Sequence, residues 1–401
     1  MSSKRRLYYF GFYVNPDHIA ERIPILSPAS TSKMSYIADC LGDDFDVRIV
    51  SPGFCSSLGS FCSKEVAETN RRVTYLASAG DGKPFLSFKK ALFARARIAE
   101  FIDEHIDGDA DVLVYSQPWA NGAVINALKK KGKSFVLEVE ELHATNEKTS
   151  LPRRVVFRFV EKHAISKAMA LIVINEAVKG LLDKESIVCH GEYVPGFKES
   201  SYKGGDEKDT EIGILYSGGI DEERGIFLLM KSLGLLPTQY RDSITLHIAG
   251  YFHGHGSKDT RDAFEMSVKQ LEASGLRVMF YGTLRKEELE SLVERCQICV
   301  SPQLIENNFS VYSFPSKILF YLTRGKLVVS SAIPAVLSSP FANFLVMYSQ
   351  DKPERLVEAI VKAIDSMGSY YVASLKELHT TLKKEHQRFR EEVLQLFKLS
   401  R

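Results

Sequence analysis

The sequence lacks several features that mark specialised classes of protein. It has six cysteines in 401 residues, without the spacing of a disulfide framework, which favours a reducing cytoplasm. No apolar run reaches the ~18 residues of a membrane-spanning helix, so we expect a soluble or peripheral protein. The 52 basic and 50 acidic side chains nearly balance, which argues against a nucleic-acid partner.

Two common site motifs are also missing or incomplete. Cys296-Gln-Ile-Cys299 is a lone CxxC between a helix and a strand, and no second pair of cysteines is present to complete a zinc site. We interpret it as structural. A GxGxxG motif is absent from the turn after the first predicted strand, which argues against an NAD enzyme. Only one tryptophan occurs; Trp119 follows the predicted strand 111–115, and it could stack on a sugar or fill a core.

The length and composition suit two soluble domains of about 150–200 residues each. A predicted strand at 7–13, a helix at 33–41 and a strand at 46–51 form a strand–helix–strand unit, which is the seed of a doubly wound parallel sheet. Residues 193–209 are rich in glycine, serine and charge, which is typical of a linker.

The segment 309–331 predicts a loop, a helix and a buried strand. Pro315 suits the start of a helix, because its missing N–H would have had no partner there. Residues 317–321 read as helix, and Gly325 can end it in a left-handed conformation. The apolar run 327–331 then predicts a short strand.

Ser316 and Lys317 would lie at the N-terminus of this helix. Free backbone N–H groups and the helix dipole favour a phosphate or another anion at such a position. The alternative is a surface helix with an ordinary cap.

A glycine-containing turn follows the strand predicted at 212–216. Gly218 and Gly219 would let the backbone approach a ligand closely, as turns that hold anions require. Arg224 offers a bidentate donor for a phosphate group. This turn and the helix at Lys317 are the predicted anion-binding elements.

Two stretches together resemble a known family. The first is Phe314-Pro-Ser-Lys317, followed by Tyr321-Leu-x-x-Gly-Lys326 and an apolar strand. It is similar to the donor-site signature of GT-B glycosyltransferases of the family-4 type, above all those that build bacterial capsular and exopolysaccharides. The second, residues 215–226, resembles the strand and loop that open the family's C-terminal domain. In outline the resemblance covers residues 110–370.

The resemblance implies an α/β fold of the GT-B type, with two Rossmann-like doubly wound parallel-sheet domains that face each other across a cleft. We expect an acceptor-side domain at 1–194, a linker at 195–210 and a nucleotide-sugar-binding domain at 211–370. Residues 371–401 would form a C-terminal helix that packs back on the first domain.

The sequence departs from the family pattern at several positions. Tyr312 and Phe320 stand where the family usually carries two glutamates eight residues apart. Gly219 stands where a second basic residue usually holds the donor diphosphate, and we expect Lys317 to supply that charge. Residues 24–31 replace the usual glycine-rich loop after the first strand.

Polar residues after the predicted strand 134–139 are the catalytic candidates. Glu140, Glu141 and His143 follow this strand, and a carboxylate or imidazole there could accept the proton of an acceptor hydroxyl. The alternative is that the acidic residues simply begin a helix, where the dipole favours them. Glu306, in the loop before Phe-Pro-Ser-Lys, is the candidate for a sugar contact or is an exposed loop residue.

Two segments mix basic and apolar residues in a helical pattern. They are 85–102 and 153–162, and such helices can lie on anionic lipid. A solvated outer face over a core is the alternative. We expect a cytoplasmic protein, with the inner face of the membrane as a possible location.

The resemblance implies a retaining hexosyltransferase-type glycosyltransferase in cell-surface polysaccharide biosynthesis. It would transfer a sugar from a nucleotide-diphosphate sugar to a hydroxyl of a glycan or lipid-linked glycan, without a metal or another cofactor. Two alternatives stay open: a non-catalytic glycosyltransferase-like binding subunit, favoured by Tyr312, Phe320 and Gly219, and a GT-B epimerase that acts on the nucleotide-sugar itself.

Overall fold

The computed structural model of the chain describes residues 4–15, 18, 28–52, 60–79, 88–116, 118–142, 150–197, 211–252, 258–306, 309–367 and 369–398. The chain divides into two compact units. Unit 1 consists of residues 1–191 and 387–401, and unit 2 consists of residues 192–386.

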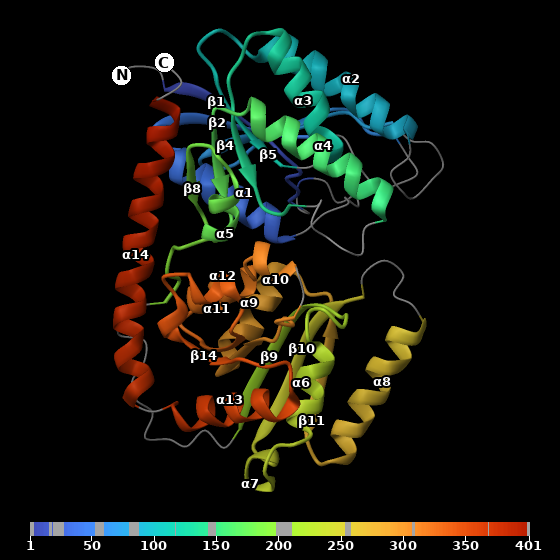
Figure 1. Ribbon diagram of the computed structural model, residues 1–401, viewed down its shortest axis with the longest axis vertical. Coiled ribbons are helices and arrows are strands. Elements are labelled where there is room, and N and C mark those ends of the chain that lie inside the picture. The colour runs from blue at the N-terminus through green and yellow to red at the C-terminus, as the bar shows by residue number, and fades with distance from the viewer. Residues whose placement is uncertain are drawn as a thin grey trace. The chain divides into compact units, whose positions relative to one another are not determined.

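Unit 1 alternates strands and helices along most of its length (Figure 1). Its elements are β1 (Arg5–Phe10), α1 (Pro28–Leu41), β2 (Phe45–Ser51), β3 (Lys64–Ala67), β4 (Arg71–Tyr75), α2 (Phe88–His105), β5 (Asp111–Tyr115), α3 (Pro118–Lys130), β6 (Val136–Val139), α4 (Leu151–Lys167), β7 (Ala170–Val173), α5 (Glu176–Leu181), β8 (Ser186–Val188) and the last part of α14 (Ser369–Lys398).

The sheet of unit 1 has the order β3-β4-β2-β1-β5-β6-β7-β8, and only β3 runs antiparallel to its neighbour. The strands β1, β5, β6 and β7 are almost entirely buried because their apolar residues face helices on both sides. The order reverses between β1 and β5, so this is the switch point of a doubly wound sheet. Helices α2, α3 and α4 pack in series beside the sheet (Figure 1).

Unit 2 repeats the same plan with six strands. Its elements are β9 (Ile212–Gly219), α6 (Ile226–Leu233), α7 (Thr238–Arg241), β10 (Ile244–Tyr251), α8 (Lys258–Ala273), β11 (Arg277–Gly282), α9 (Lys286–Arg295), β12 (Ile298–Ser301), α10 (Phe309–Tyr312), α11 (Ser316–Leu322), β13 (Leu327–Ser331), α12 (Pro334–Leu337), η3 (Ala342–Phe344), β14 (Leu345–Tyr348), α13 (Pro353–Asp365) and the first part of α14.

All strand pairs of the second sheet are parallel, in the order β11-β10-β9-β12-β13-β14. Helix α6 packs against both α8 and α13, and together they bury the apolar side chains of one sheet face. Here the order reverses between β9 and β12. The two parallel-sheet domains predicted from the sequence are therefore confirmed.

The end of α14 packs on unit 1. Phe389 is fully buried and its ring stacks on Tyr36 of α1 at a centroid distance of 5.8 Å. Arg390 forms ion pairs with Asp43 and Asp44, at 3.0 and 3.3 Å. These contacts make the last residues of the chain part of the first unit's core.

Several local predictions can be compared directly with the structure. The strand at 327–331 is observed as β13, and Gly325 has the predicted left-handed backbone, with φ +65. The predicted linker lies mostly outside the described residues. Residues 64–67 were not expected to be a strand, but they pair with β4 as the outer strand β3.

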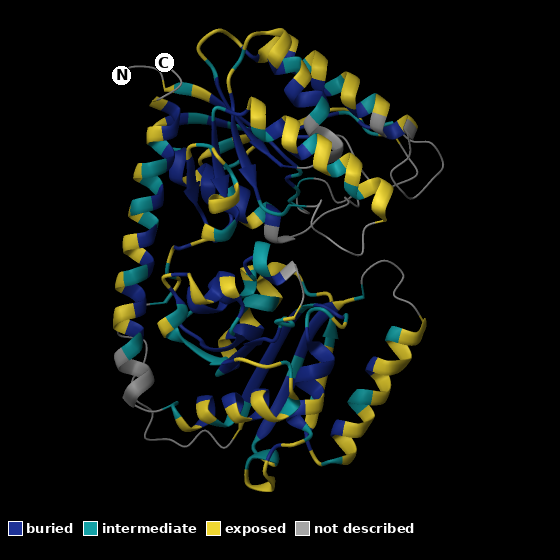
Figure 2. Cartoon of the chain, in the orientation of Figure 1, coloured by how far each residue is buried: buried dark blue, intermediate teal, exposed yellow. Residues whose placement is uncertain are grey.

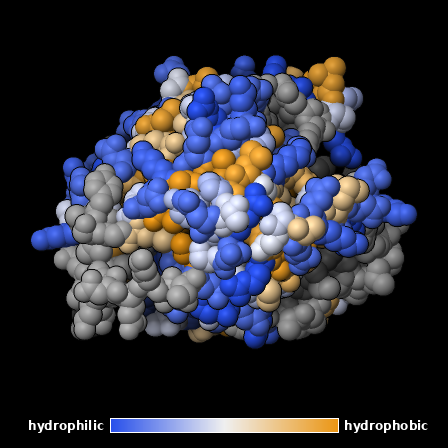
Figure 3. Space-filling model, turned by 90° about the horizontal axis from the view of Figure 1, so that it is seen from below, coloured by the Kyte–Doolittle hydropathy of each residue, from blue (hydrophilic) through white to orange (hydrophobic). Residues whose placement is uncertain are grey.

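The described part of the face seen in Figure 3 is mostly polar. Figure 3 views the molecule from below Figure 1, where hydrophilic residues cover much of the described face and smaller hydrophobic patches lie between them. In the part of the chain that the structure describes, none of the helices has both the length and the apolar character needed to cross a bilayer.

Candidate functional site

The predicted anion-binding turn lies at the switch point of the second sheet. Residues after β9 meet residues after β12 there, and Gly225 lies against Pro302. A Cβ atom on Gly225 would lie 1.7 Å from the carbonyl oxygen of Pro302, and its φ is +73. Only glycine can occupy this position, which brings the two strand ends together where ligands of open α/β sheets bind.

Asp221 organises the turn between β9 and α6. Its carboxylate accepts the backbone N–H of Arg224 at 2.8 Å, and its other oxygen pairs with the guanidinium of Arg224 at 3.0 Å. The side chain of Arg224 is 37% exposed. The guanidinium is thus held in one orientation on a side chain that is partly exposed.

Lys317 of α11 extends to the same turn. Its Nζ atom lies 4.5 Å from the centroid of the Tyr216 ring, within the range of a cation–π interaction. A Cβ on Gly218 would be 2.4 Å from this Nζ, and the φ of Gly218 is +138. Gly218 therefore leaves the space that the ammonium group occupies.

Two tyrosines fix the backbone on either side of Gly218. The hydroxyl of Tyr216 donates to the carbonyl of Gly219 at 2.6 Å. Tyr321 of α11 is buried, and its hydroxyl oxygen accepts the backbone N–H of Ser217 at 3.1 Å. The second bond ties α11 to the end of β9, so the position of Lys317 relative to the turn is set by the fold.

The electrostatics of this cluster favour an added anion. Burial lowers the pKa of Lys317 to about 7, and repulsion from Arg224 contributes to the shift, while Asp221 opposes it. Within the described residues Lys317 makes no ion pair. A negatively charged ligand between the two cations would relieve this repulsion.

Glu306 precedes α10 in the chain, and Ser316 follows it. Ser316 is exposed as the first residue of α11. Glu306 is also exposed, and its backbone N–H donates to Asp351 at 3.2 Å. The loop that carries Glu306 is held in place by Asp351, which also accepts the N–H of Ile305 at 2.8 Å.

Phe320 and Tyr312 occupy the two positions where the resemblance leads one to expect glutamates. Phe320 is half-buried, and the guanidinium of Arg324 lies 3.8 Å from its ring centroid. Arg324 also pairs with Glu290 of α9. The ring of Phe320 thus makes a cation–π contact with Arg324 within unit 2. A glutamate at this position could hold Arg324 only by forming an ion pair with it.

One acidic candidate of unit 1, Glu140, belongs to a largely buried charge cluster. Glu140, just after β6, forms an ion pair with Lys33 of α1. Lys33 is buried and also lies 3.6 Å from Glu138, which is completely buried. The hydroxyl of Tyr9 in β1 donates a hydrogen bond to Glu138. Glu140 itself is half-buried, with 20% of its side chain exposed, and it follows β6 at the carboxyl edge of the sheet.

Burial and ion pairing shift the pKa values of Lys33 and Glu138 in opposite directions. Burial raises the pKa of Glu138, although the charge of Lys33 opposes the shift. Burial by itself would lower the pKa of Lys33, but attraction to Glu140 and Glu138 outweighs it and the pKa is raised. Lys33 is therefore held in its charged form.

Sequence reasoning missed both Lys33 and Glu138. A signal was present: Glu138 interrupts the apolar run Val136-Leu-Glu-Val139, and Lys33 precedes Met34 at the start of an apolar helix face. A charged residue in each of two buried segments indicates a pair.

The remaining candidates can be placed only in part. Glu141 is half-buried next to Glu140. His143 and the side chain of Trp119 lie outside the described residues. Gly219 ends β9 and contributes its carbonyl to the Tyr216 hydrogen bond.

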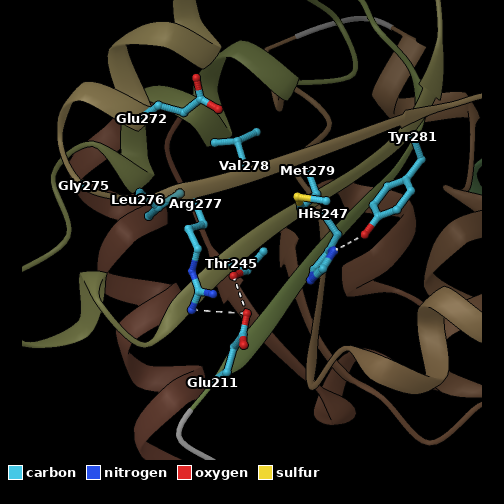
Figure 4. A pocket seen from close by; sticks show the side chains of 10 residues that line it. All are labelled: Glu211, Thr245, His247, Glu272, Gly275, Leu276, Arg277, Val278, Met279 and Tyr281. Atoms are coloured by element: carbon cyan, nitrogen blue, oxygen red, sulfur yellow. Dashed lines mark hydrogen bonds and ion pairs between the residues drawn. The ribbon is translucent and has the colours of Figure 1, made fainter.

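A separate hollow of about 560 Å³ lies at the β10–β11 edge of the second sheet (Figure 4). There Arg277 pairs with Glu211 at 3.3 Å, and His247 forms a hydrogen bond with Tyr281 at 2.8 Å. Among the residues that line it are none that the sequence predicted for the site. Among the described residues, no group of three histidine, cysteine, aspartate or glutamate side chains is arranged to hold a metal ion.

Comparison with known proteins identifies the class of the second unit. Residues 211–366 match the family described as Glycosyl transferases group 1. Unit 2 therefore contains a domain of this type, and the site described above lies within it. No curated protein sequence matches the chain.

Solved structures resemble the whole chain. Trehalose-6-phosphate synthase OtsA has a TM-score of 0.74 at 10% identity, with 98% of this chain and 99% of that chain covered. Sucrose-phosphate synthase from Thermosynechococcus elongatus has a TM-score of 0.69 at 14% identity, with 97% and 99% covered. An E. coli trehalose-6-phosphate structure bound with UDP-2-fluoro glucose has a TM-score of 0.72 at 11% identity, with 98% and 99% covered. The fold is thus of the GT-B type, as the sequence predicted.

Proposed function

We propose that this protein is a retaining glycosyltransferase that transfers a sugar from a nucleotide-diphosphate sugar to an acceptor hydroxyl. The observation that carries the proposal is the cluster of Gly218, Arg224 and Lys317 at the switch point of unit 2. When the bond to the sugar breaks, negative charge develops on the departing diphosphate. Two fixed cations beside a glycine turn stabilise such charge by preorganised electrostatics.

Each donor-site residue has a distinct role in the proposal. Arg224 binds the diphosphate through two N–H groups, and Lys317 supplies the second positive charge in place of the basic residue absent at Gly219. Ser316 offers its hydroxyl and backbone N–H at the start of α11, and Glu306 contacts the donor sugar.

Glu140 is the proposed group that accepts the proton of the acceptor hydroxyl, with Glu141 and His143 beside it in the chain. Its ion pair with Lys33 supports this role, because the pair holds the carboxylate in one position. The chain requires no metal in this scheme.

The ligands to try first follow from the similar structures. One was solved with UDP-2-fluoro glucose and another, from Burkholderia xenovorans, with glucose-6-phosphate. We propose a hexosyl donor and a glycan or lipid-linked glycan acceptor of the kind used in capsular and exopolysaccharide synthesis, in the cytoplasm at the membrane face.

The test is turnover of nucleotide-sugars with and without added glycan acceptor. We expect release of the nucleoside diphosphate only when acceptor is present. Arg224→Ala should lower the rate of turnover by about 100-fold or more. The matched control is Arg277→Ala, which removes an arginine that is 59% exposed in the hollow at the β10–β11 edge. Turnover without acceptor would instead indicate an epimerase, and full activity of Arg224→Ala would contradict the diphosphate assignment.

A second candidate is a non-catalytic subunit that binds nucleotide. Phe320 favours it, because its ring and Arg324 occupy the position where a donor-binding glutamate is usual. Nucleotide binding without turnover over the whole acceptor panel would support this candidate.

A further inference from the structure

Helix α4 exposes an apolar stripe. Leu151, Val155 and Phe159 are 71%, 53% and 78% exposed, and Val156 beside them is 58% exposed. Residues four apart lie on one face of a helix, so the first three form a line about 12 Å long. The opposite face is the buried one, where Glu161 and Ala164 lie. The stripe therefore points away from the core of unit 1, and Figure 2 shows exposed residues along α4.

Basic residues accompany the stripe. The helix carries five basic side chains and one acidic side chain, a net charge of 5 − 1 = +4, whereas the whole chain has 52 − 50 = +2. The rest of the chain thus has a net charge of −2. The acidic residue, Glu161, is on the buried face. The basic residues are Arg153, Arg154, Arg158, Lys162 and Lys167.

This combination selects one kind of partner. Large apolar side chains on a convex helix gain free energy by entering an apolar medium, and the flanking cations require negative charge at its boundary. The long stems of arginine and lysine can lie along an apolar surface while their charged ends remain in the polar layer. A bilayer that contains anionic lipids provides both: acyl chains for the apolar side chains and negatively charged headgroups for the basic ones.

We propose that α4 docks in the headgroup layer of an anionic bilayer, with Leu151, Val155, Val156 and Phe159 inserted toward the acyl chains and Arg158 and Lys162 on the lipid phosphates. Arg158 and Lys162 lie one turn apart beside the inserted line. The docking is reversible, because the apolar stripe covers only two turns of helix.

The first test is cosedimentation of the full chain with vesicles. Phosphatidylcholine vesicles rich in phosphatidylglycerol should bind the protein, and pure phosphatidylcholine vesicles should bind it much more weakly. Val156→Ser with Phe159→Ser should weaken binding at least about tenfold. Arg158→Gln with Lys162→Gln should weaken it by about fivefold per charge, and added salt should reproduce that loss.

Matched controls come from α8 of unit 2. Met266 is 59% exposed and Lys269 is exposed, so Met266→Ser and Lys269→Gln change the same properties elsewhere and should leave vesicle binding unchanged. Circular dichroism of each variant checks that it is folded. The assay measures binding and not turnover, so its result is independent of the proposed sugar transfer.

Three results would overturn the proposal. The wild-type chain could fail to bind anionic vesicles, or the α4 variants could bind as well as the wild type. Light scattering could also show a dimer that the Phe159 variant dissociates while no vesicle binding occurs, in which case the stripe contacts a second copy of the chain.

Discussion

The ammonium group of Lys317 occupies the space that a side chain at residue 218 would need, because a Cβ on Gly218 would lie only 2.4 Å from its Nζ. The same Nζ lies over the ring of Tyr216. These residues come from β9 and α11, which the Ser217–Tyr321 hydrogen bond joins. The amino group of Lys317 is thereby fixed beside a glycine turn before any ligand arrives.

Gly218→Ala should therefore disturb the site as well as the fold. We expect a loss of about 1–3 kcal/mol in the free energy of unfolding, because the backbone at φ +138 disfavours a side chain. We also expect at least about tenfold weaker binding of nucleoside diphosphate, because Lys317 must move. Urea unfolding and titration calorimetry measure the two effects.

Gly275→Ala is the control for Gly218. Gly275 also has a positive φ, +91, but nothing lies within 4 Å of the added Cβ. The Gly275→Ala variant should be less stable than the wild type but should bind nucleotide with the same affinity. Equal loss of affinity in both variants would mean that the effect of Gly218→Ala comes from general destabilisation.

The affinity for a nucleoside diphosphate should depend on pH through Lys317. Its pKa in the free protein is lowered to about 7, and a bound diphosphate favours the charged form, so the pKa rises on binding. Below the free-state pKa the ammonium is already present. Above it, binding takes up a proton and affinity falls as the pH rises.

Calorimetry in two buffers with different ionisation enthalpies measures that proton uptake. Lys317→Met should bind weakly and lose the uptake, while Lys317→Arg, which stays charged, should lose the uptake but keep affinity at high pH. Proton uptake that persists in Lys317→Met would assign the titration to another group.

The sequence predicted the parts of the fold that local patterns determine. The strand 327–331 is an uninterrupted apolar run, and Gly325 before it can adopt the left-handed φ that ends α11. Both were predicted because each depends on a few neighbouring residues. The outer strand β3 was missed because three of its four residues are exposed and its pairing with β4 leaves no apolar alternation.

Candidate site residues could be predicted only where a single short segment contains a recognisable motif. Gly218 and Arg224 lie at a recognisable glycine-containing turn and Lys317 lies at the start of a recognisable helix, although their sequence could not show that Lys317 lies against Gly218. The Lys33–Glu138 pair joins residues far apart in the chain. Such a pair depends on how α1 packs on β6, which periodicity does not specify.

Lys33→Met should destabilise unit 1 strongly. It leaves Glu138 buried without its cation, and breaking a buried pair in this way costs about 3–5 kcal/mol. Lys33→Met combined with Glu138→Gln should recover much of the loss, since the completely buried charge is removed and only Glu140, whose side chain is 20% exposed, is left without its cation. A double-mutant cycle by urea unfolding measures the coupling. Additive losses in the cycle would contradict a direct pair.

Phe389→Ala should destabilise unit 1 although the residue lies near the end of the chain. Phe389 is fully buried against Tyr36, and truncation of a buried phenylalanine costs about 3–5 kcal/mol. Gln387→Ala, at an exposed position of the same helix, should change stability little. Hydrogen exchange in β1 and β2 would locate the effect, and unchanged protection there would show that the helix end contributes nothing to unit 1.

Nucleotide binding tests the central claim most directly. Thermal unfolding of the wild-type chain and of Arg224→Ala would be followed with millimolar UDP, GDP, ADP, CMP or NAD, because a ligand that binds only the folded state raises the melting temperature. The account predicts a selective increase with one nucleoside diphosphate, none with NAD, and loss of the increase in Arg224→Ala. No increase with any nucleotide, or the same increase in the variant, would contradict a diphosphate site at Arg224 and Lys317.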